Sequence, residues 1–268
     1  MSYKRGRKSK LSGHTSHGDG KAKEVIIICM GLILAAIPFC YGKYFEFKLN
    51  DPFDSALNVY SAKSIIDGQK LGTEVKASAR PATLLVNIIG VAIFGYSEFG
   101  PKLIQTLMQL AALAMMFYTL RKIYGSIPAL VSLVLACFYL SCPPFAKYGN
   151  VKEQFMIACM IISISAVVLS RTGSSWWWLV ISGAFAINTY YFKPTGVSVV
   201  IAVVVYFLAG FICRRRGLFR TVSDFCGFIF EIGKYLGEFR SNALRQINRK
   251  PGTQSYPDNL SIFFIFNA

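Results

Sequence analysis

Residues 51–102, DPFDSALNVYSAKSIIDGQKLGTEVKASARPATLLVNIIGVAIFGYSEFGPK, form a polar, acid-bearing loop of about fifty residues between apolar segments that look membrane-spanning. Carboxylates are stable at a water interface, whereas burial of a charge in hydrocarbon is strongly unfavourable. The loop therefore offers a membrane protein a place for acid–base chemistry. Asp54 is the candidate residue for it.

The composition predicts a membrane protein. Of 268 residues, 54% are hydrophobic, and they gather in nearly uncharged runs of 15 to 18 residues. A soluble domain would instead alternate with a period of two or 3.6 residues. With their polar flanks, six runs reach the roughly 20 residues that a spanning helix needs. We predict an all-α, polytopic transmembrane helical bundle of about six spans, at residues 25–41, 103–120, 127–142, 155–170, 176–192 and 196–213.

A seventh apolar run, residues 81–95, is shorter and contains Asn87 and Gly90. Lysine and arginine collect on cytoplasmic flanks of membrane helices. Six spans with a cytoplasmic N-terminus place all the main basic clusters inside, whereas seven spans would put several of them outside. We therefore predict that 81–95 is an interfacial helix in a long first extracytoplasmic loop, 42–101. The clusters are Lys4–Lys10, Lys21, Lys23, Arg121, Lys122, Arg171, Arg214–Arg216 and Arg220.

This topology divides the chain into a basic cytoplasmic tail (1–24, expected to be disordered), a membrane domain (25–213) and a basic C-terminal segment (214–268). The net charge of +16 resides mostly in the two terminal segments. A basic flank is the ordinary topology signal, so we expect membrane lipids and no nucleic acid as partners. The C-terminal segment is interpreted as a cytoplasmic interfacial helix or a truncated end.

No metal site and no cofactor are predicted from the residues, and the use of a divalent metal is left open. The seven cysteines form no C-x-x-C pair, and they have no metal-ligand spacing with His14 and His17. The cysteines are interpreted as small packing residues within the helices.

The predicted outer face collects acids and bases from several loops. A carboxylate there can deprotonate an acceptor hydroxyl, while Lys and Arg can hold an anionic phosphate as it leaves. This set suits transfer from a phosphate-activated donor. The alternative is that these groups are solvated loop charges and lysines that reach water from helix ends. The set comprises Asp51, Asp54, Glu74, Arg80, Lys102, Lys147, Lys152, Glu153 and Lys193.

The loop itself contains a helical pattern. Residues 56–66 have a helical period, and Asp67-Gly68 is a typical C-terminal stop. Asp54 precedes the pattern and is expected to be the N-cap, a role that by itself contributes about 1 kcal/mol. A catalytic role and a capping role are compatible.

The pattern D-x-A-x5-A-x-x-I-x-x-G, from Asp54 to Gly68, precedes Arg80-Pro81, Phe94-Gly95 and Lys102. It resembles the first extracytoplasmic loop of the GT-C superfamily of membrane glycosyltransferases, which includes protein O-mannosyltransferases and aminoarabinose transferases of lipid A. The resemblance covers roughly residues 25–213. It implies that Asp54 is catalytic and that the donor is a polyprenyl-phosphate sugar.

The resemblance also implies roles for basic and polar residues. Arg80-Pro81 would open the interfacial helix, and Lys102 stands where the family commonly has arginine. Glu153 and Lys193 are similar to polar residues in the family's later outer loops. With Lys147, we assign Arg80, Lys102, Glu153 and Lys193 to substrate binding. The chain departs from the family in having Ser55 where a second acid is common, and in a length about half that of typical members.

Three functions follow as hypotheses. The leading one is a glycosyltransferase that moves a sugar from a polyprenyl-phosphate donor to an acceptor at the outer face of the cell inner membrane. The alternative is a non-catalytic or truncated GT-C-like protein, acting as a partner subunit with another membrane protein that supplies the missing half, or as a nonfunctional fragment. A transporter is the third. It is disfavoured because the spans contain almost no ionisable residues.

Overall fold

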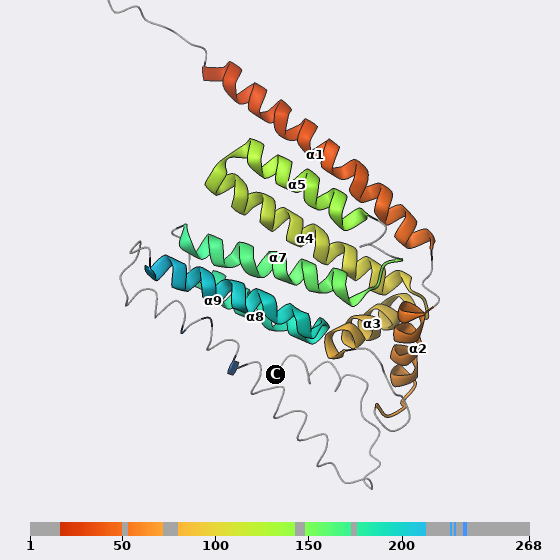
Figure 1. The fold of residues 1–268 in the computed structure, drawn as a ribbon. Coiled ribbons are helices and arrows are strands. Elements are labelled where there is room, and N and C mark those ends of the chain that lie inside the picture. Colours follow the sequence, from red (N-terminus) through yellow and green to blue (C-terminus); the bar gives the residue numbers. More distant parts are fainter. Residues whose placement is uncertain are drawn as a thin grey trace, which may run out of the picture.

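Figure 1 shows the fold of the protein in a computed structural model. The structure describes residues 17–49, 53–71, 80–142, 148–172 and 176–212, together with residues 226, 228 and 233–234. Most of the predicted C-terminal segment, 214–268, lies outside these ranges.

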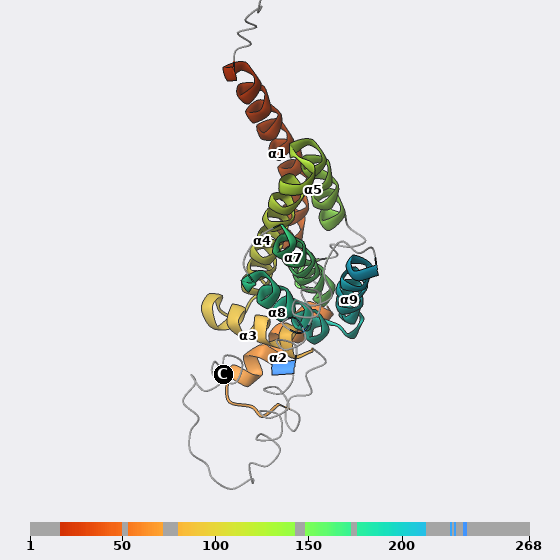
Figure 2. The ribbon, with the colours of Figure 1, turned by 90° about the vertical axis from the view of Figure 1, so that its left-hand side faces the viewer.

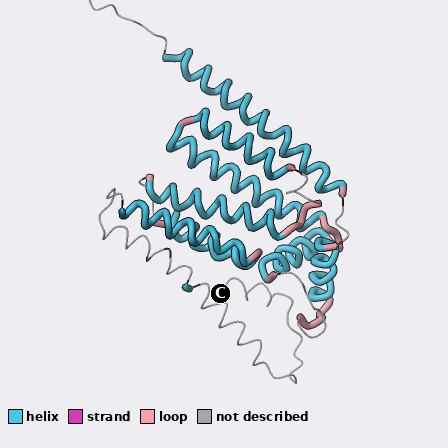
Figure 3. Tube along the Cα trace, viewed as in Figure 1, coloured by secondary structure: helices cyan, strands magenta, loops and turns pink. Residues whose placement is uncertain are grey.

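The described residues form eight α-helices, one 3-10 helix and no strand, as the helices and loops of Figure 3 show. This confirms the predicted all-α class. The elements are α1 (His17–Lys48), α2 (Asp54–Ile66), α3 (Pro81–Phe94), α4 (Phe99–Tyr124), α5 (Ser126–Ser141), α7 (Lys152–Arg171), α8 (Trp177–Phe192), η1 (Pro194–Gly196) and α9 (Val197–Ile212).

Six helices make up the body of the molecule, and each coincides with one of the six predicted spans. They are α1, α4, α5, α7, α8 and α9, which run back and forth along a common direction (Figure 1). α5 packs against α1 and α4, and α7 packs against α4 and α8. Figure 2 shows the same helices from the side, where they form a narrow stack. The fold is that of a helical membrane bundle.

Three of these helices are long and apolar enough to cross a membrane by themselves, at Glu24–Lys48, Phe99–Tyr124 and Lys152–Arg171. α5 is apolar but has 16 residues, which corresponds to about 24 Å and is shorter than the hydrocarbon core of a typical bilayer. The first helix is longer than the predicted 25–41 at both ends, since α1 begins at His17, within the tail expected to be disordered, and continues to Lys48. Its last two turns contain charged residues that the neighbouring helices bury.

Close packing of α1 on α5 depends on glycine. A Cβ added at Gly42 would lie 2.5 Å from Ser141 Cβ, and one at Gly31 would lie 2.6 Å from a methyl group of Leu130. Membrane helices often approach each other through such small residues, because apolar side chains gain nothing from leaving lipid.

α2 and α3 lie at one end of the bundle, where α1 ends and α4 begins (Figure 1). We call this the α2–α3 end. α2 ends before Asp67-Gly68 and α3 begins at Pro81, both as expected, whereas α2 begins at Asp54 itself. α3 crosses α4 closely, since a Cβ at Gly90 would lie 2.5 Å from the nitrogen of Pro101. Its position in a membrane interface remains a prediction.

The opposite end of the bundle joins α1 to the connection between α4 and α5. Ser126 Oγ hydrogen-bonds to Glu24 Oε1 at 2.8 Å, and Arg121 lies 3.6 Å from the same carboxylate oxygen. The start of α1 and the end of α4 therefore lie at the same side of the bundle, as the six-span topology requires.

Candidate functional site

The predicted catalytic residue, Asp54, is exposed at the α2–α3 end. It is the first residue of α2, and Phe53 occupies the position before the helix. The expected N-cap role of Asp54 is therefore wrong, because the helix begins one residue earlier than that role requires. A carboxylate in the first turn is still favoured by the helix dipole, and the side chain remains open to solvent.

The next residue, Ser55, is tied into a buried hydrogen-bond network. Asn150 Nδ2 donates to Ser55 Oγ at 2.7 Å and to Asn87 Oδ1 at 2.9 Å. Asn87 Nδ2 in turn donates to Asn150 Oδ1 at 3.3 Å and to the carbonyl of Thr83 at 2.8 Å. Ser55, Asn87 and Asn150 are each fully buried. The network connects α2, α3 and the turn before α7.

That turn has an unusual backbone. Gly149 has φ of 76° and Asn150 has φ of 53°. Glycine adopts this left-handed region freely, and asparagine is among the few other residues that do so. A Cβ at Gly149 would lie 3.1 Å from Glu46 Oε2, so the turn passes directly against α1.

A buried charged cluster lies beneath the turn. Glu46 Oε2, on the last turns of α1, accepts hydrogen bonds from Lys43 Nζ at 2.7 Å and from Gln105 Nε2 at 3.2 Å. Gln105 Oε1 accepts from the backbone N–H of Val151 at 3.2 Å. Among the described residues, Glu46 Oε1 is buried without a hydrogen-bond partner. The cluster joins α1, α4 and the 148–151 turn.

Lys102 is brought to the same end but is buried, with 1% of its surface exposed. Its ammonium donates to the carbonyl of Leu49 at 2.6 Å and lies 2.8 Å from Glu98 Oε2. This lysine connects the start of α4 to the residue after α1. Its charge is neutralised within the protein.

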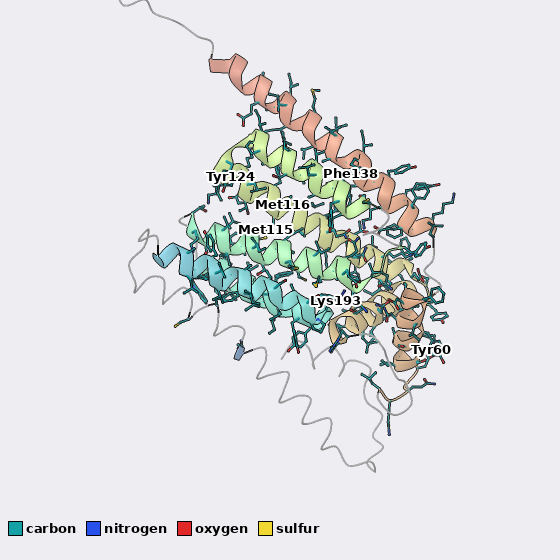
Figure 4. All side chains as sticks on the ribbon, viewed as in Figure 1. Tyr60, Met115, Met116, Tyr124, Phe138 and Lys193 are labelled. Atoms are coloured by element: carbon teal, nitrogen blue, oxygen red, sulfur yellow. The ribbon has the colours of Figure 1, made fainter. Side chains whose placement is uncertain are left out.

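Glu153 and Lys193 form an ion pair at 2.8 Å. It links the start of α7 to the turn between α8 and η1, and both side chains are partly exposed. Figure 4 places Lys193 at the α2–α3 end, far from Tyr124 at the opposite end. Two of the five residues predicted to bind substrate, Glu153 and Lys193, are thus brought together from 40 positions apart.

Arg80 is exposed immediately before Pro81, the first residue of α3. It lies at the α2–α3 end by its place in the chain. Lys147, with Asp51 and Glu74 of the predicted outer set, lies outside the described residues. Within the described ranges, no three His, Cys, Asp or Glu side chains gather closely enough to hold a metal ion.

Sequence reasoning missed the charged cluster and the asparagine network. The spacing of Lys43 and Glu46, one turn apart in YGKYFEFK, is the signal that could have indicated a continuing helix. On α4, Gln109 Nε2 donates a hydrogen bond to Gln154 Oε1 of α7. No local pattern indicates that Asn150 reaches Ser55.

Comparison with protein families identifies the chain. Residues 80–229, more than half of the sequence, match the model of the family described as dolichyl-phosphate-mannose-protein mannosyltransferase. The chain belongs to this mannosyltransferase family. Searches of curated proteins and of solved structures gave no match.

Membership in the mannosyltransferase family confirms the predicted resemblance to GT-C membrane glycosyltransferases. The protein is therefore an integral membrane protein of the GT-C glycosyltransferase type. The matched region begins at Arg80 and runs from α3 through α9. Asp54 and Glu46 precede it, so their roles depend on the geometry of the site and on the motif around Asp54.

Proposed function

We propose that the protein transfers a sugar from a polyprenyl-phosphate donor to an acceptor hydroxyl at the α2–α3 end of the bundle. In this proposal, that end faces the extracytoplasmic side of the cell inner membrane. The observation that supports it most is the mannosyltransferase family match over residues 80–229. The family's description names a lipid-phosphate mannose as donor, and a multi-helix membrane bundle suits a donor held in lipid.

Asp54 is the proposed general base. Its carboxylate is exposed and starts a helix whose second residue is fixed by the buried Asn150 network. In an inverting displacement, the acceptor oxygen attacks the anomeric carbon while Asp54 takes the hydroxyl proton. The bond between the anomeric carbon and the phosphate oxygen breaks, and polyprenyl phosphate leaves.

The leaving phosphate needs positive charge nearby. Arg80 is the best-placed candidate, because it is exposed immediately before α3. Lys193 and Lys147 are further proposed contacts, with Glu153 orienting Lys193 through their ion pair. Lys102 belongs to the proposed set as well. It would have to exchange Glu98 for the donor phosphate, because the two side chains are paired in this structure.

The test uses membranes containing the full chain, supplied with radiolabelled dolichyl-phosphate mannose. Transfer is measured as label that moves from the lipid extract to the protein and polar fractions. Asp54→Asn removes the base and keeps the size of the side chain. Asp67→Asn is the matched control, since it makes the same change at the other end of α2, where Asp67 pairs with Lys63.

We expect Asp54→Asn to reduce transfer by about 10²- to 10⁴-fold, and Asp67→Asn to retain transfer within twofold of wild type. Equal transfer by wild type and Asp54→Asn would exclude the proposed base. An inactive wild type, with this donor and with an undecaprenyl-phosphate sugar, would overturn the proposed function in favour of a non-catalytic partner subunit.

A further inference from the structure

Asn150 connects three parts of the chain that are distant in sequence. Its amide bonds to Ser55 on α2 and to Asn87 on α3, which are 95 and 63 positions away. The preceding residue, Gly149, lies against Glu46 of α1, and the following N–H, that of Val151, donates to Gln105 of α4. The 148–151 turn thus holds the start of α2 against the bundle.

The identity of residue 150 is strongly restricted by this arrangement. The backbone is left-handed, with φ of 53°, a conformation that disfavours most side chains by roughly 1–2 kcal/mol. The side chain must also supply two N–H donors and one acceptor in a fully buried position. Asparagine satisfies both requirements, since it tolerates the left-handed region and has a donor–acceptor amide.

The contact with Ser55 is significant because of its neighbour. Asp54 is exposed, and the backbone of α2 reaches the buried network through Ser55. Within the first turn of α2, Ser55 is the buried residue, because Asp54, Ala56 and Leu57 are exposed. The hydrogen bond between Ser55 and Asn150 therefore restricts the position of the neighbouring Asp54 carboxylate.

From this geometry we infer that Asn150 is a positioning residue for the Asp54 carboxylate, acting through the hydroxyl of Ser55. This inference rests on the proposed function, in which Asp54 is the base. It predicts a specific kinetic signature. Loss of the contact displaces the base, and a displacement near 1 Å can lower a rate by about 10²-fold. Donor binding depends on other groups and should change little.

The experiment compares Asn150→Gly, which keeps the left-handed backbone, with Ser55→Ala and the double variant. Each is made in wild type and in the Asp54→Asn background. Asn188→Ala is the matched control, since the Asn188 amide donates to a carbonyl of its own helix, Ala184 O. Transfer from dolichyl-phosphate mannose gives kcat and KM. The hydrogen-exchange rate of the Leu57 amide reports how often the first turn of α2 opens, because Leu57 N–H donates to Phe53 O in that turn.

We expect each single variant to lower kcat by about 10- to 100-fold while KM for the donor stays within twofold. The double variant should be no worse than either single one, because both remove the same contact. In the Asp54→Asn background, neither change should lower the residual rate further. Exchange of the Leu57 amide should become at least tenfold faster in both single variants and stay unchanged in Asn188→Ala.

The outcomes separate this inference from the proposed function. If Asp54→Asn is inactive while Asn150→Gly and Ser55→Ala keep kcat within twofold of wild type, the positioning role is overturned and the proposed function stands. If Asp54→Asn transfers as well as wild type, or if wild type is inactive, the proposed function fails and this inference fails with it. If the exchange rate of the Leu57 amide is unchanged in both single variants, the Ser55–Asn150 bond does not hold the first turn of α2. That result would overturn the inference even if the transfer rate changes.

Discussion

Lys102 donates a hydrogen bond of 2.6 Å to the carbonyl of Leu49, and the same ammonium lies 2.8 Å from Glu98. The lysine is at the start of α4, and Leu49 is the residue after α1. A cation beside the last carbonyls of a helix also interacts favourably with the helix dipole. Lys102, a predicted substrate contact, thus has a structural role in this arrangement.

Lys102→Ala should destabilise the protein. It removes the ammonium that Glu98 and the Leu49 carbonyl contact in a partly buried site, and loss of such a partner typically costs about 1–3 kcal/mol. The measurement is thermal unfolding in detergent, with Lys122→Ala as control, because Lys122 is exposed at the other end of the same helix. If Lys102 served donor binding alone, its substitution would raise KM and leave the unfolding temperature equal to that of the control.

Gly149→Ala should be more destabilising than Gly68→Ala. Both glycines have positive φ, 76° and 96°, so the substitutions share the backbone strain, which is about 1–2 kcal/mol. The added methyl group at Gly149 would meet Glu46 Oε2 at 3.1 Å and Lys102 Cγ at 3.3 Å, whereas the one at Gly68 meets nothing within 4 Å. Unfolding temperatures of the two variants measure the difference. If both variants lower the unfolding temperature equally, the 148–151 turn can move away from Glu46 without a loss of stability.

Gly90→Ala should separate α3 from α4. The new Cβ would lie 2.5 Å from both the nitrogen and Cδ of Pro101, and backbone atoms cannot yield as a flexible side chain can. Overpacking of this kind typically costs about 1–3 kcal/mol. Ala92→Leu is the control, since it adds a larger group to α3 at an exposed position. A lower unfolding temperature for Gly90→Ala than for Ala92→Leu is the expected result, and the reverse order would contradict the close crossing.

The topology can be tested by labelling of single cysteines in a cysteine-free background. Ser97 lies between α3 and α4 at the α2–α3 end, and Ser126 starts α5 at the opposite end. With a membrane-impermeant maleimide on whole cells, Ser97→Cys should react, and Ser126→Cys should react after the cells are opened. Reaction of Ser97→Cys from the inside alone would overturn the six-span topology and the proposed face of the site.

Much of the secondary structure could be predicted from local patterns. An apolar run of this length indicates a helix in any membrane protein. Backbone N–H and C=O groups without partners are costly in lipid, and a helix pairs them within the segment. The end of α2 followed from Asp67-Gly68, and the bounds of α3 followed from Pro81 and Gly95. Each of these signals involves residues that are close together in the chain, so it can be recognised without knowledge of the tertiary structure.

Sequence alone determined the all-α membrane class, the six main helices, the two helices of the first loop and the mannosyltransferase family. Tertiary structure decided how the ends of those helices meet. α1 continues through Lys43 and Glu46, which pair with each other, while Gln105 bonds Glu46 and Gly149 lies against it. Asn150 meets Ser55 across 95 positions of the chain. Such contacts depend on how whole helices pack, and a buried polar group is satisfied by whichever partner that packing brings near.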